Sequence, residues 1–128
     1  MKTTVIYLAG PITGSANAKG WREAATDRLL GLGFEVINPM LIEASTMDDH
    51  EVVKLDFRAV LKSSALLVDA RRPSWGTAME VLFAFQTNIP VIAWGVEDPA
   101  AASPWLRHHA YFTTATLDGA LFELGAMQ

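Results

Sequence analysis

Hydrophobic residues along the chain alternate between short continuous runs and longer stretches with helical spacing. The short runs end at Gly, Pro or Asn or give way to a helical stretch, as buried strands do. They are residues 4–9, 34–39, 65–70 and 89–94, with a short fifth strand expected around 111–112. The longer stretches predict helices over residues 20–33, 50–64, 77–88 and 117–126, and a Pro-Ala-Ser loop is expected over 98–104.

Continuous apolar strands separated by helices indicate a parallel sheet that is covered on both faces. We therefore expect a doubly wound α/β sheet of about five mainly parallel strands. A small sheet of this kind most often has the strand order 2-1-3-4-5, and ligands then bind outside the carboxyl ends of strands one and three. The segments that follow these two strands are residues 9–20 and 70–77.

Size and composition narrow the class of protein. The 128 residues are 51% hydrophobic and 19% charged, which predicts a single globular domain over 1–128. The net charge of -4 disfavours nucleic-acid polymers and anionic membranes as partners, because both attract a basic face. The chain has no cysteine and no apolar run long enough for a signal peptide or membrane span, so we expect a cytoplasmic protein with a small-molecule partner.

Asp56 lies beside the apolar stripe of the second predicted helix, over residues 50–64. The stripe is expected to consist of Val53, Phe57, Val60 and Leu61. An acid at the edge of such a stripe is usually solvated or paired with a neighbouring cation. A surface role and a functional role both remain open for Asp56 at this point.

Glu80 is the other carboxylate of interest, at the start of the helix over 77–88. The stretch "TAME" fits a capping box, with Thr77 as the N-cap and Glu80 reaching back to its backbone. A glutamate in the first turn also suits the helix dipole, which keeps it ionised. A nucleophilic carboxylate must be ionised too, so capping and catalysis are compatible.

Polar groups around Glu80 suggest a place for a phosphate or hydroxyl. Ser74 and the backbone N–H groups of Gly76 and Thr77 are expected to face the same cavity as Glu80. In the alternative, Ser74 caps the turn and Gly76 lets the backbone bend. Trp75 would stack on a base or belong to the core. Three arginines could supply positive charge to a bound anion: Arg22, Arg71 and Arg72. In the alternative, they lie on the surface without a function.

Several familiar motifs are absent from the sequence. The phosphate-binding motifs G-x-x-x-x-G-K-[ST] and G-x-G-x-x-G do not occur. The G-x-S-x-G elbow of serine hydrolases is missing too. His50, His108 and His109 do not have a metal-ligand spacing, and the adjacent pair is expected near the surface. We therefore expect no metal and no cofactor.

The stretches "IYLAGPITG", "DFRAVLKSSALLVDA" and "PSWGTAMEV" together resemble the nucleoside 2-deoxyribosyltransferase superfamily, in matching order over nearly the whole chain. The resemblance implies a flavodoxin-like (Rossmann-like) fold, a homodimer or dimer of dimers, and cleavage of an N-glycosidic bond through a glutamyl-sugar intermediate. Glu80 would be the nucleophile, with Asp56 and Tyr7 arranging it and the sugar. The residues implied in substrate binding are Gly10, Ile12, Arg22, Ser74, Gly76, Thr77, Ser103 and Trp105.

Three features resemble the 2'-deoxynucleoside 5'-phosphate N-hydrolase branch. Asp56 and Glu80 are 24 residues apart, as in the hydrolases. Ser74 stands where the transferases carry an aspartate, which would repel a phosphate dianion. Ser103, expected to be shared across subunits, stands where the transferases offer an asparagine. The resemblance thus implies hydrolysis of (2'-deoxy)nucleoside 5'-monophosphates; the alternatives are a base-exchanging 2'-deoxyribosyltransferase and a non-catalytic nucleotide-binding module.

Overall fold

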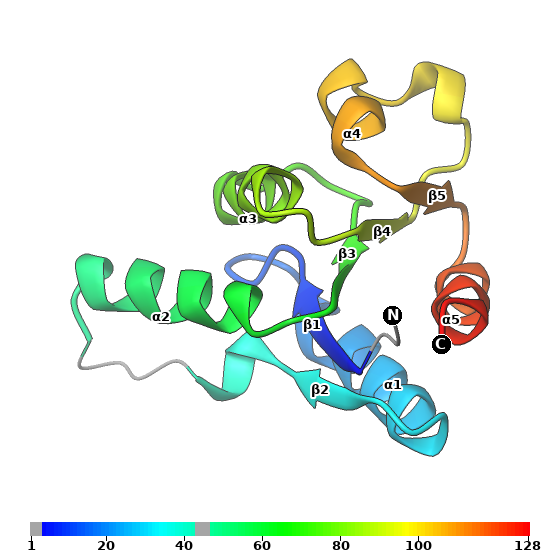
Figure 1. Cartoon of the computed structure of the whole chain (residues 1–128). Helices are drawn as coiled ribbons and strands as arrows, with labels where there is room; N and C mark the ends of the chain where they lie inside the picture. The colour runs from blue at the N-terminus through cyan, green and yellow to red at the C-terminus, as the bar shows by residue number, and fades with distance from the viewer. Residues whose placement is uncertain (1–3, 43–46) are drawn as a thin grey trace.

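Five strands lie side by side and parallel in one sheet. The computed structural model describes residues 4–42 and 47–128, and in these ranges the strand order is β2-β1-β3-β4-β5 (Figure 1). The predicted fold and strand order are therefore confirmed. The strands are β1 (Val5–Ala9), β2 (Glu35–Ile37), β3 (Ala65–Asp69), β4 (Val91–Trp94) and β5 (Phe112–Thr114).

Helices cover both faces of this sheet (Figure 1). They are α1 (Ala18–Gly31), α2 (Asp49–Leu61), α3 (Trp75–Gln86), α4 (Pro104–His109) and α5 (Leu117–Ala126), with short 3-10 helices η1 (Pro39–Leu41) and η2 (Pro99–Ala101). Within the described ranges, none of these helices has the length and apolar character needed to cross a bilayer.

The strands alternate their side chains between two apolar layers. Ile6 and Leu8 of β1 pack in the layer shared with α1 and α5, whereas Tyr7 and Ala9 belong to the layer shared with α2 and α3. Neighbouring residues of a strand point to opposite faces, so a strand covered on both faces must be apolar throughout. This explains the continuous apolar runs in the sequence.

The carboxyl ends of β1 and β3 meet at one edge of the sheet. Ala9 pairs with Val68, so the next residues of the two strands, Gly10 and Asp69, are neighbours. A Cβ atom added to Gly10 would lie 2.9 Å from the Cβ of Asp69. Only glycine allows this close approach, and it occurs at the predicted ligand-binding edge.

Helix α4 is an element that sequence patterns did not reveal. The Ser103 hydroxyl accepts a hydrogen bond from the Trp105 amide, and Pro104 occupies the first helical position. Both features are typical helix starts. The predicted loop over 98–104 is therefore partly wrong, because η2 and the first residue of α4 lie within it. Six residues are too few to show an apolar period in the sequence.

Candidate active site

Tyr7 and Glu80 form the central contact of the candidate site. The Tyr7 hydroxyl donates a hydrogen bond of 2.5 Å to Glu80 Oε2. Tyr7 is wholly buried in β1, and Glu80 is 9% exposed on the inner face of α3. The two residues are 73 positions apart in the chain, and the fold brings them together across the sheet and its covering helix.

The predicted capping box at the start of α3 is wrong. The helix begins at Trp75 with Ser74 as its N-cap, so Thr77 lies inside the first turn. Glu80 is consequently in the second turn, and its carboxylate bonds to Tyr7. A threonine and a serine three residues apart are both acceptable N-caps, and local sequence does not choose between them.

Asp56 faces the same region from α2. Of the expected core stripe, Val60 is buried and Phe57 is half-buried, whereas Val53 and Leu61 are more than half exposed. The stripe is thus confirmed in part, and the half-buried Asp56 lies beside its inner residues. Asp56 acts electrostatically on both Tyr7 and Glu80, and burial raises its own pKa.

Burial sets the protonation of Glu80. It raises the pKa of this carboxyl to about 7, and the charge of Asp56 pushes in the same direction. The hydrogen bond from Tyr7 and the positive charge of Arg22 lower it. A glutamate in the first turn of a helix was expected to be ionised. Glu80 lies in the second turn and is buried, so the cost of burying its charge outweighs the helix dipole. Near neutral pH, both the acid and the carboxylate are populated.

Tyr7 remains a proton donor throughout the physiological pH range. Burial and the neighbouring Glu80 both raise the pKa of its hydroxyl above the ordinary value of 10.0. Arg22 acts in the opposite direction but more weakly. The hydroxyl therefore keeps its proton and donates it to Oε2 of Glu80. The other carboxylate oxygen, Oε1, takes no part in this hydrogen bond.

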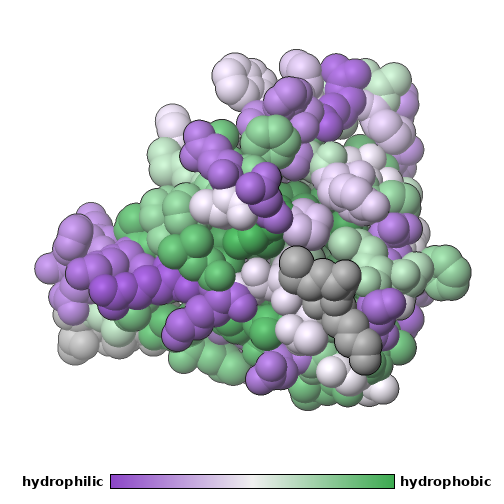
Figure 2. Space-filling view, in the orientation of Figure 1, coloured by the Kyte–Doolittle hydropathy of each residue, from purple (hydrophilic) through white to green (hydrophobic). Residues whose placement is uncertain are grey.

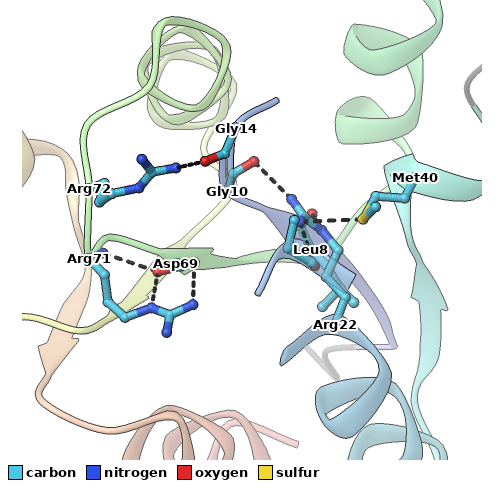
Figure 3. A network of polar contacts seen from close by, with 9 residues as sticks. Leu8, Gly10, Gly14, Arg22, Met40, Asp69, Arg71 and Arg72 are labelled. Carbon is cyan, nitrogen blue, oxygen red and sulfur yellow. Dashed lines mark hydrogen bonds and ion pairs between the residues drawn. The ribbon is translucent and has the colours of Figure 1, made fainter. Parts of the chain in front are cut away.

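Arg22 lies behind β1, with no exposed surface (Figure 3). Its Nη2 donates to the carbonyl of Gly10 at 2.8 Å, its Nε to that of Leu8 at 3.3 Å, and its Nη1 to that of Ala18 at 3.0 Å. The surface alternative for Arg22 is therefore wrong. Sequence patterns missed its burial because a charged side chain does not count as part of an apolar stripe.

Asp69, at the end of β3, is paired with Arg71 (Figure 3). The Arg71 guanidinium donates from Nε and Nη2 to the two carboxylate oxygens, each at 2.9 Å, and stacks over Trp94. The Arg71 side chain itself is partly exposed, whereas Asp69 is 2% exposed. Arg72 reaches across to the Gly14 carbonyl at 3.4 Å and so links the two predicted ligand segments.

A cavity of about 1060 Å³ lies on the other side of α3, toward α4. Among the described residues, Ser74 and Thr77 line it at the start of α3. Trp105 of α4 and Ser103, the N-cap residue of α4, line it from the other side. Tyr7, Asp56 and Glu80 are not among its described lining residues. The structure therefore divides the predicted site residues into a buried acid cluster and an open cavity, with α3 between them.

The start of α3 offers free hydrogen-bonding groups to this cavity. The Ser74 side chain makes no capping bond, and the first backbone amides of a helix have no partner within it. Thr77 is 8% exposed, and its hydroxyl has no partner among the described residues. These donors, with the positive end of the helix dipole, form an arrangement that suits an anion.

The other predicted binding residues differ in their exposure. Gly10 is buried at the end of β1, and Ile12 is 43% exposed beyond it. Trp75 and Trp105 are 85% and 77% exposed, so the core alternative for Trp75 is wrong. Gly76 is exposed in the first turn of α3 and has open space where a side chain would be.

The two adjacent histidines lie on the surface, as predicted. His108 is exposed and His109 is half-buried on α4, and both pack against the ring of Phe85. In residues 4–42 and 47–128, no three His, Asp or Glu side chains gather closely enough to hold a metal ion.

Solved structures share this fold at low sequence identity, whereas no curated protein matches the chain. A conserved protein from Enterococcus faecalis V583 superposes with a TM-score of 0.78 at 19% identity, over 98% of this chain and 99% of that one. A 2-deoxyribosyltransferase from Bacillus psychrosaccharolyticus gives 0.76 at 17% identity, over 92% and 90%. The 2-deoxyribosyltransferase from Leishmania mexicana gives 0.72 at 14% identity, over 96% and 97%.

At these identities the structural likeness shows the fold alone, and the fold is similar to that of nucleoside 2-deoxyribosyltransferases. A family model gives a firmer assignment. It matches residues 4–93, which include β1 through β3, α3 and most of β4, and therefore Tyr7, Asp56 and Glu80. The chain belongs to the family described as Domain of unknown function (DUF4406).

Proposed function

We propose that this protein cleaves the N-glycosidic bond of (2'-deoxy)nucleoside 5'-monophosphates through a covalent glutamyl-sugar intermediate. The observation that carries the proposal is the hydrogen bond between Tyr7 and Glu80, with Asp56 facing the same carboxylate. A buried carboxylate held by one oxygen at the ligand-binding edge of a parallel sheet is suited to nucleophilic attack. Similarity to 2-deoxyribosyltransferase structures adds support at the level of the fold.

The reaction would proceed by double displacement. The free oxygen of ionised Glu80 attacks C1' of the sugar, and the base leaves with the electrons of the C–N bond. Water then attacks C1' from the vacated side, which breaks the ester, regenerates Glu80 and releases the sugar 5-phosphate. The proton that the water loses balances the proton that the departing base takes up. Tyr7 would orient the nucleophile, while Asp56 would contact the sugar.

The phosphate would bind at the start of α3. Ser74, the amides of Gly76 and Thr77, and Ser103 provide hydroxyl and N–H donors without a repelling carboxylate among them. Three carboxylates, Asp69, Glu97 and Asp98, also line the cavity. Arg71 neutralises Asp69 through two hydrogen bonds, and Arg72 adds a positive charge to the lining. The proposal therefore places the sugar on the Glu80 side of α3 and the phosphate at its N-terminus. Gly10 and Ile12 at the end of β1 and Trp105 on α4 would border the bound nucleotide.

A homodimer or a dimer of dimers, with the Ser103 segment reaching the neighbouring subunit, belongs to the same proposal. Hydrophobic surface gathers over α3 in the view of Figure 2. The large apolar side chains with substantial exposure on α3 and α4 are Trp75, Met79, Leu82, Phe85 and Trp105. A contiguous apolar patch of this kind marks an interaction surface.

The test is to incubate the protein with deoxynucleoside monophosphates and with deoxynucleosides, with and without an acceptor base, and to separate the products. We expect free base from the monophosphates without an acceptor. Glu80→Ala should lower turnover by at least about 10³-fold, as is usual for loss of a covalent nucleophile. Glu23→Gln, an exposed glutamate of α1, is the matched control and should leave turnover unchanged.

Two results would contradict the hydrolase. Base exchange on unphosphorylated nucleosides, with little hydrolysis, would favour the transferase alternative. Nucleotide binding without turnover, unaffected by Glu80→Ala, would favour a non-catalytic binding module.

A further inference from the structure

Asp69 and Arg71 form a clamp at the point where β3 leads into α3 (Figure 3). The Asp69 carboxylate, on a residue that is 2% exposed, accepts three hydrogen bonds from Arg71. Two come from the guanidinium at 2.9 Å each, and the third comes from the Arg71 backbone amide at 3.1 Å. A buried carboxylate needs such partners, because an unpaired buried charge is costly. Asp69 therefore holds both the backbone and the side chain of Arg71.

The end of β4 fixes Arg71 from a second direction. The Arg71 guanidinium lies 4.4 Å from the centre of the Trp94 ring, and the Ala70 amide donates to the Trp94 carbonyl at 2.9 Å. Gly95 follows with a φ of +86°. A Cβ atom added to Gly95 would lie 2.5 Å from Arg71 Cγ and 3.1 Å from the Arg71 backbone nitrogen. Glycine at position 95 thus provides both the backbone conformation and the space that Arg71 requires.

A short stretch of chain connects the clamp to the start of α3. Only Arg72 and Pro73 separate Arg71 from Ser74, the N-cap residue of α3. Arg72 donates to the Gly14 carbonyl at 3.4 Å, and the ring of a proline fixes its φ angle. This connection has little freedom, so the position of Arg71 determines where the first turn of α3 begins.

The first turn of α3 contains hydrogen-bond donors that need a defined position. The backbone amides of Gly76 and Thr77 have no acceptor within the helix. The Thr77 hydroxyl belongs to a cavity-lining residue that is 8% exposed, and it has no partner among residues 4–42 and 47–128. Groups that bind a ligand must be held to within about 0.5 Å of their productive positions. The clamp supplies a structural means of holding these donors.

We propose that Asp69, Arg71 and Gly95 are positioning residues: they fix the start of α3 so that its free donors can bind a phosphate monoester together. Asp69 and Arg71 act through the backbone of residues 72–74, and Gly95 acts by leaving room for Arg71. The phosphate as ligand rests on the proposed function, whereas the positioning of α3 does not. Arg71 itself would not bind the phosphate, because its guanidinium is already bound to Asp69.

The test is an NMR measurement of two properties of the start of α3. The first is hydrogen exchange of the Ala78 amide, which donates to the Ser74 carbonyl at 3.0 Å and closes the first turn. The Val52 amide, which donates to the Asp48 carbonyl at 3.1 Å in the first turn of α2, is the internal reference. The second property is the Kd for 2-deoxyribose 5-phosphate, followed through the Gly76 amide signal, with 2-deoxyribose as the probe that lacks phosphate.

Gly95→Ala is the main variant, because it displaces Arg71 and leaves both charges of the clamp in place. Exchange of Ala78 relative to Val52 should become roughly 10-fold faster, and the Kd for the sugar phosphate should rise roughly 10-fold, as expected for local strain of this kind. Gly33→Ala is the matched control, because Gly33 has a φ of +92° but open space at its Cβ position. It should leave both values unchanged.

Arg71→Met removes the guanidinium and should change both values in the same direction as Gly95→Ala. Arg71→Lys should be intermediate, because lysine keeps the charge but cannot form the paired hydrogen bonds. The control is Arg28→Met, which breaks an exposed ion pair between Arg28 and Asp118 of the same 2.9 Å length. It should change neither value. If Arg71→Met does not fold, Gly95→Ala and its control decide the outcome.

Three results would overturn the proposal. Unchanged exchange of Ala78 in Gly95→Ala would mean that the clamp does not hold the first turn. Faster exchange with an unchanged Kd would mean that this positioning does not serve a phosphate, and so would a wild-type protein that binds neither probe or both equally. Neither probe carries a base, so the measurement needs no turnover. Failure of the proposed hydrolase would instead appear as phosphate binding by a wild-type protein that releases no base from deoxynucleoside monophosphates.

Discussion

The two sides of α3 differ in what they offer a ligand. The side toward β1 and α2 carries Glu80, which is largely buried, bonded to Tyr7 and electrostatically linked to Asp56. The side toward α4 has a large cavity and unpaired hydrogen-bond donors, such as the Thr77 hydroxyl. One side therefore has the buried acid cluster, and the other has the space and the hydrogen-bond donors that the proposed phosphate site requires.

This difference suggests a division of work along a single helix. A nucleophile benefits from burial and fixed partners, because they define its direction and its protonation. A phosphate benefits from free donors at a helix N-terminus. Since α3 begins at Ser74 and presents Glu80 in its second turn, one helix can serve both groups of the same nucleotide.

The largest effect is expected when the anion-binding side is given a negative charge. Ser74→Asp should lower kcat/KM for deoxynucleoside monophosphates by up to about 10³-fold, because like charges at roughly 4 Å cost about 4 kcal/mol at an effective dielectric constant of 20. Steady-state kinetics on monophosphates and on nucleosides would measure the ratio. Ser74→Ala is the control and should have a much smaller effect. An equal loss on both substrate types would mean that no phosphate binds there.

The acid cluster should reveal itself in the pH dependence of stability. Glu80 has a pKa of about 7 in the folded protein and 4.5 ordinarily, so the folded state loses stability as the pH rises between these values. The full effect is about 3 kcal/mol, at 1.36 kcal/mol per pKa unit. Glu80→Gln removes the charge and should stabilise the protein by up to that amount at pH 8 and little at pH 4.5, as measured by urea denaturation. A stability gain that is the same at both pH values would contradict the burial of an ionised Glu80.

The partners of Glu80 should move its titration in opposite directions. Tyr7→Phe removes a hydrogen bond that lowers the pKa of Glu80, so the acidic limb of kcat/KM should move to higher pH. Asp56→Asn removes a charge that raises it, so the limb should move to lower pH. At pH 7, Tyr7→Phe should also lower kcat/KM by roughly 10-fold, because hydrogen bonds to charged groups contribute about 1.5–3 kcal/mol. Movement of both limbs in the same direction would show that the cluster does not act as described.

The smallest effect is expected on the exposed rim of the cavity side. Met79→Glu places a charge on the apolar surface of α3, where the side chain is 52% exposed and the monomer should tolerate it. It should weaken self-association by roughly 10-fold, about 1.4 kcal/mol, as measured by sedimentation equilibrium. Leu30→Glu, at 56% exposure on α1, is the control. A wild-type protein that stays monomeric at all concentrations would remove the dimer from the proposal.

Apolar patterns in the sequence predicted the sheet well. The runs that became β1, β3 and β4 are covered on both faces, and continuous hydrophobicity is the direct consequence of that burial. The order of the strands followed from the number and type of elements, and with it the edge where Gly10 and Asp69 meet. Glu80 was also recognisable, as an isolated acid close behind β3.

Local patterns were less reliable where two arrangements satisfy the same rule. The start of α3 could be capped by Ser74 or Thr77, and the choice moved Glu80 from the first turn to the second. The predicted stripe of α2 held at Phe57, which stacks on Phe83 of α3, but not at Val53 and Leu61, because the position of α3 decides which residues of α2 are covered. Arg22 was named as a candidate binding residue, but its burial was not predicted, because its acceptors are backbone carbonyls that every residue carries.

The sequence by itself determined the layered α/β fold, because burial of apolar side chains has a period that can be seen along the chain. Tertiary structure alone decided that Tyr7 bonds to Glu80, that Arg22 is enclosed behind them, and that the cavity opens on the opposite side of α3. Such contacts join residues far apart in the chain, and their strength depends on distance and on exclusion of water. Neither quantity exists until the chain has folded.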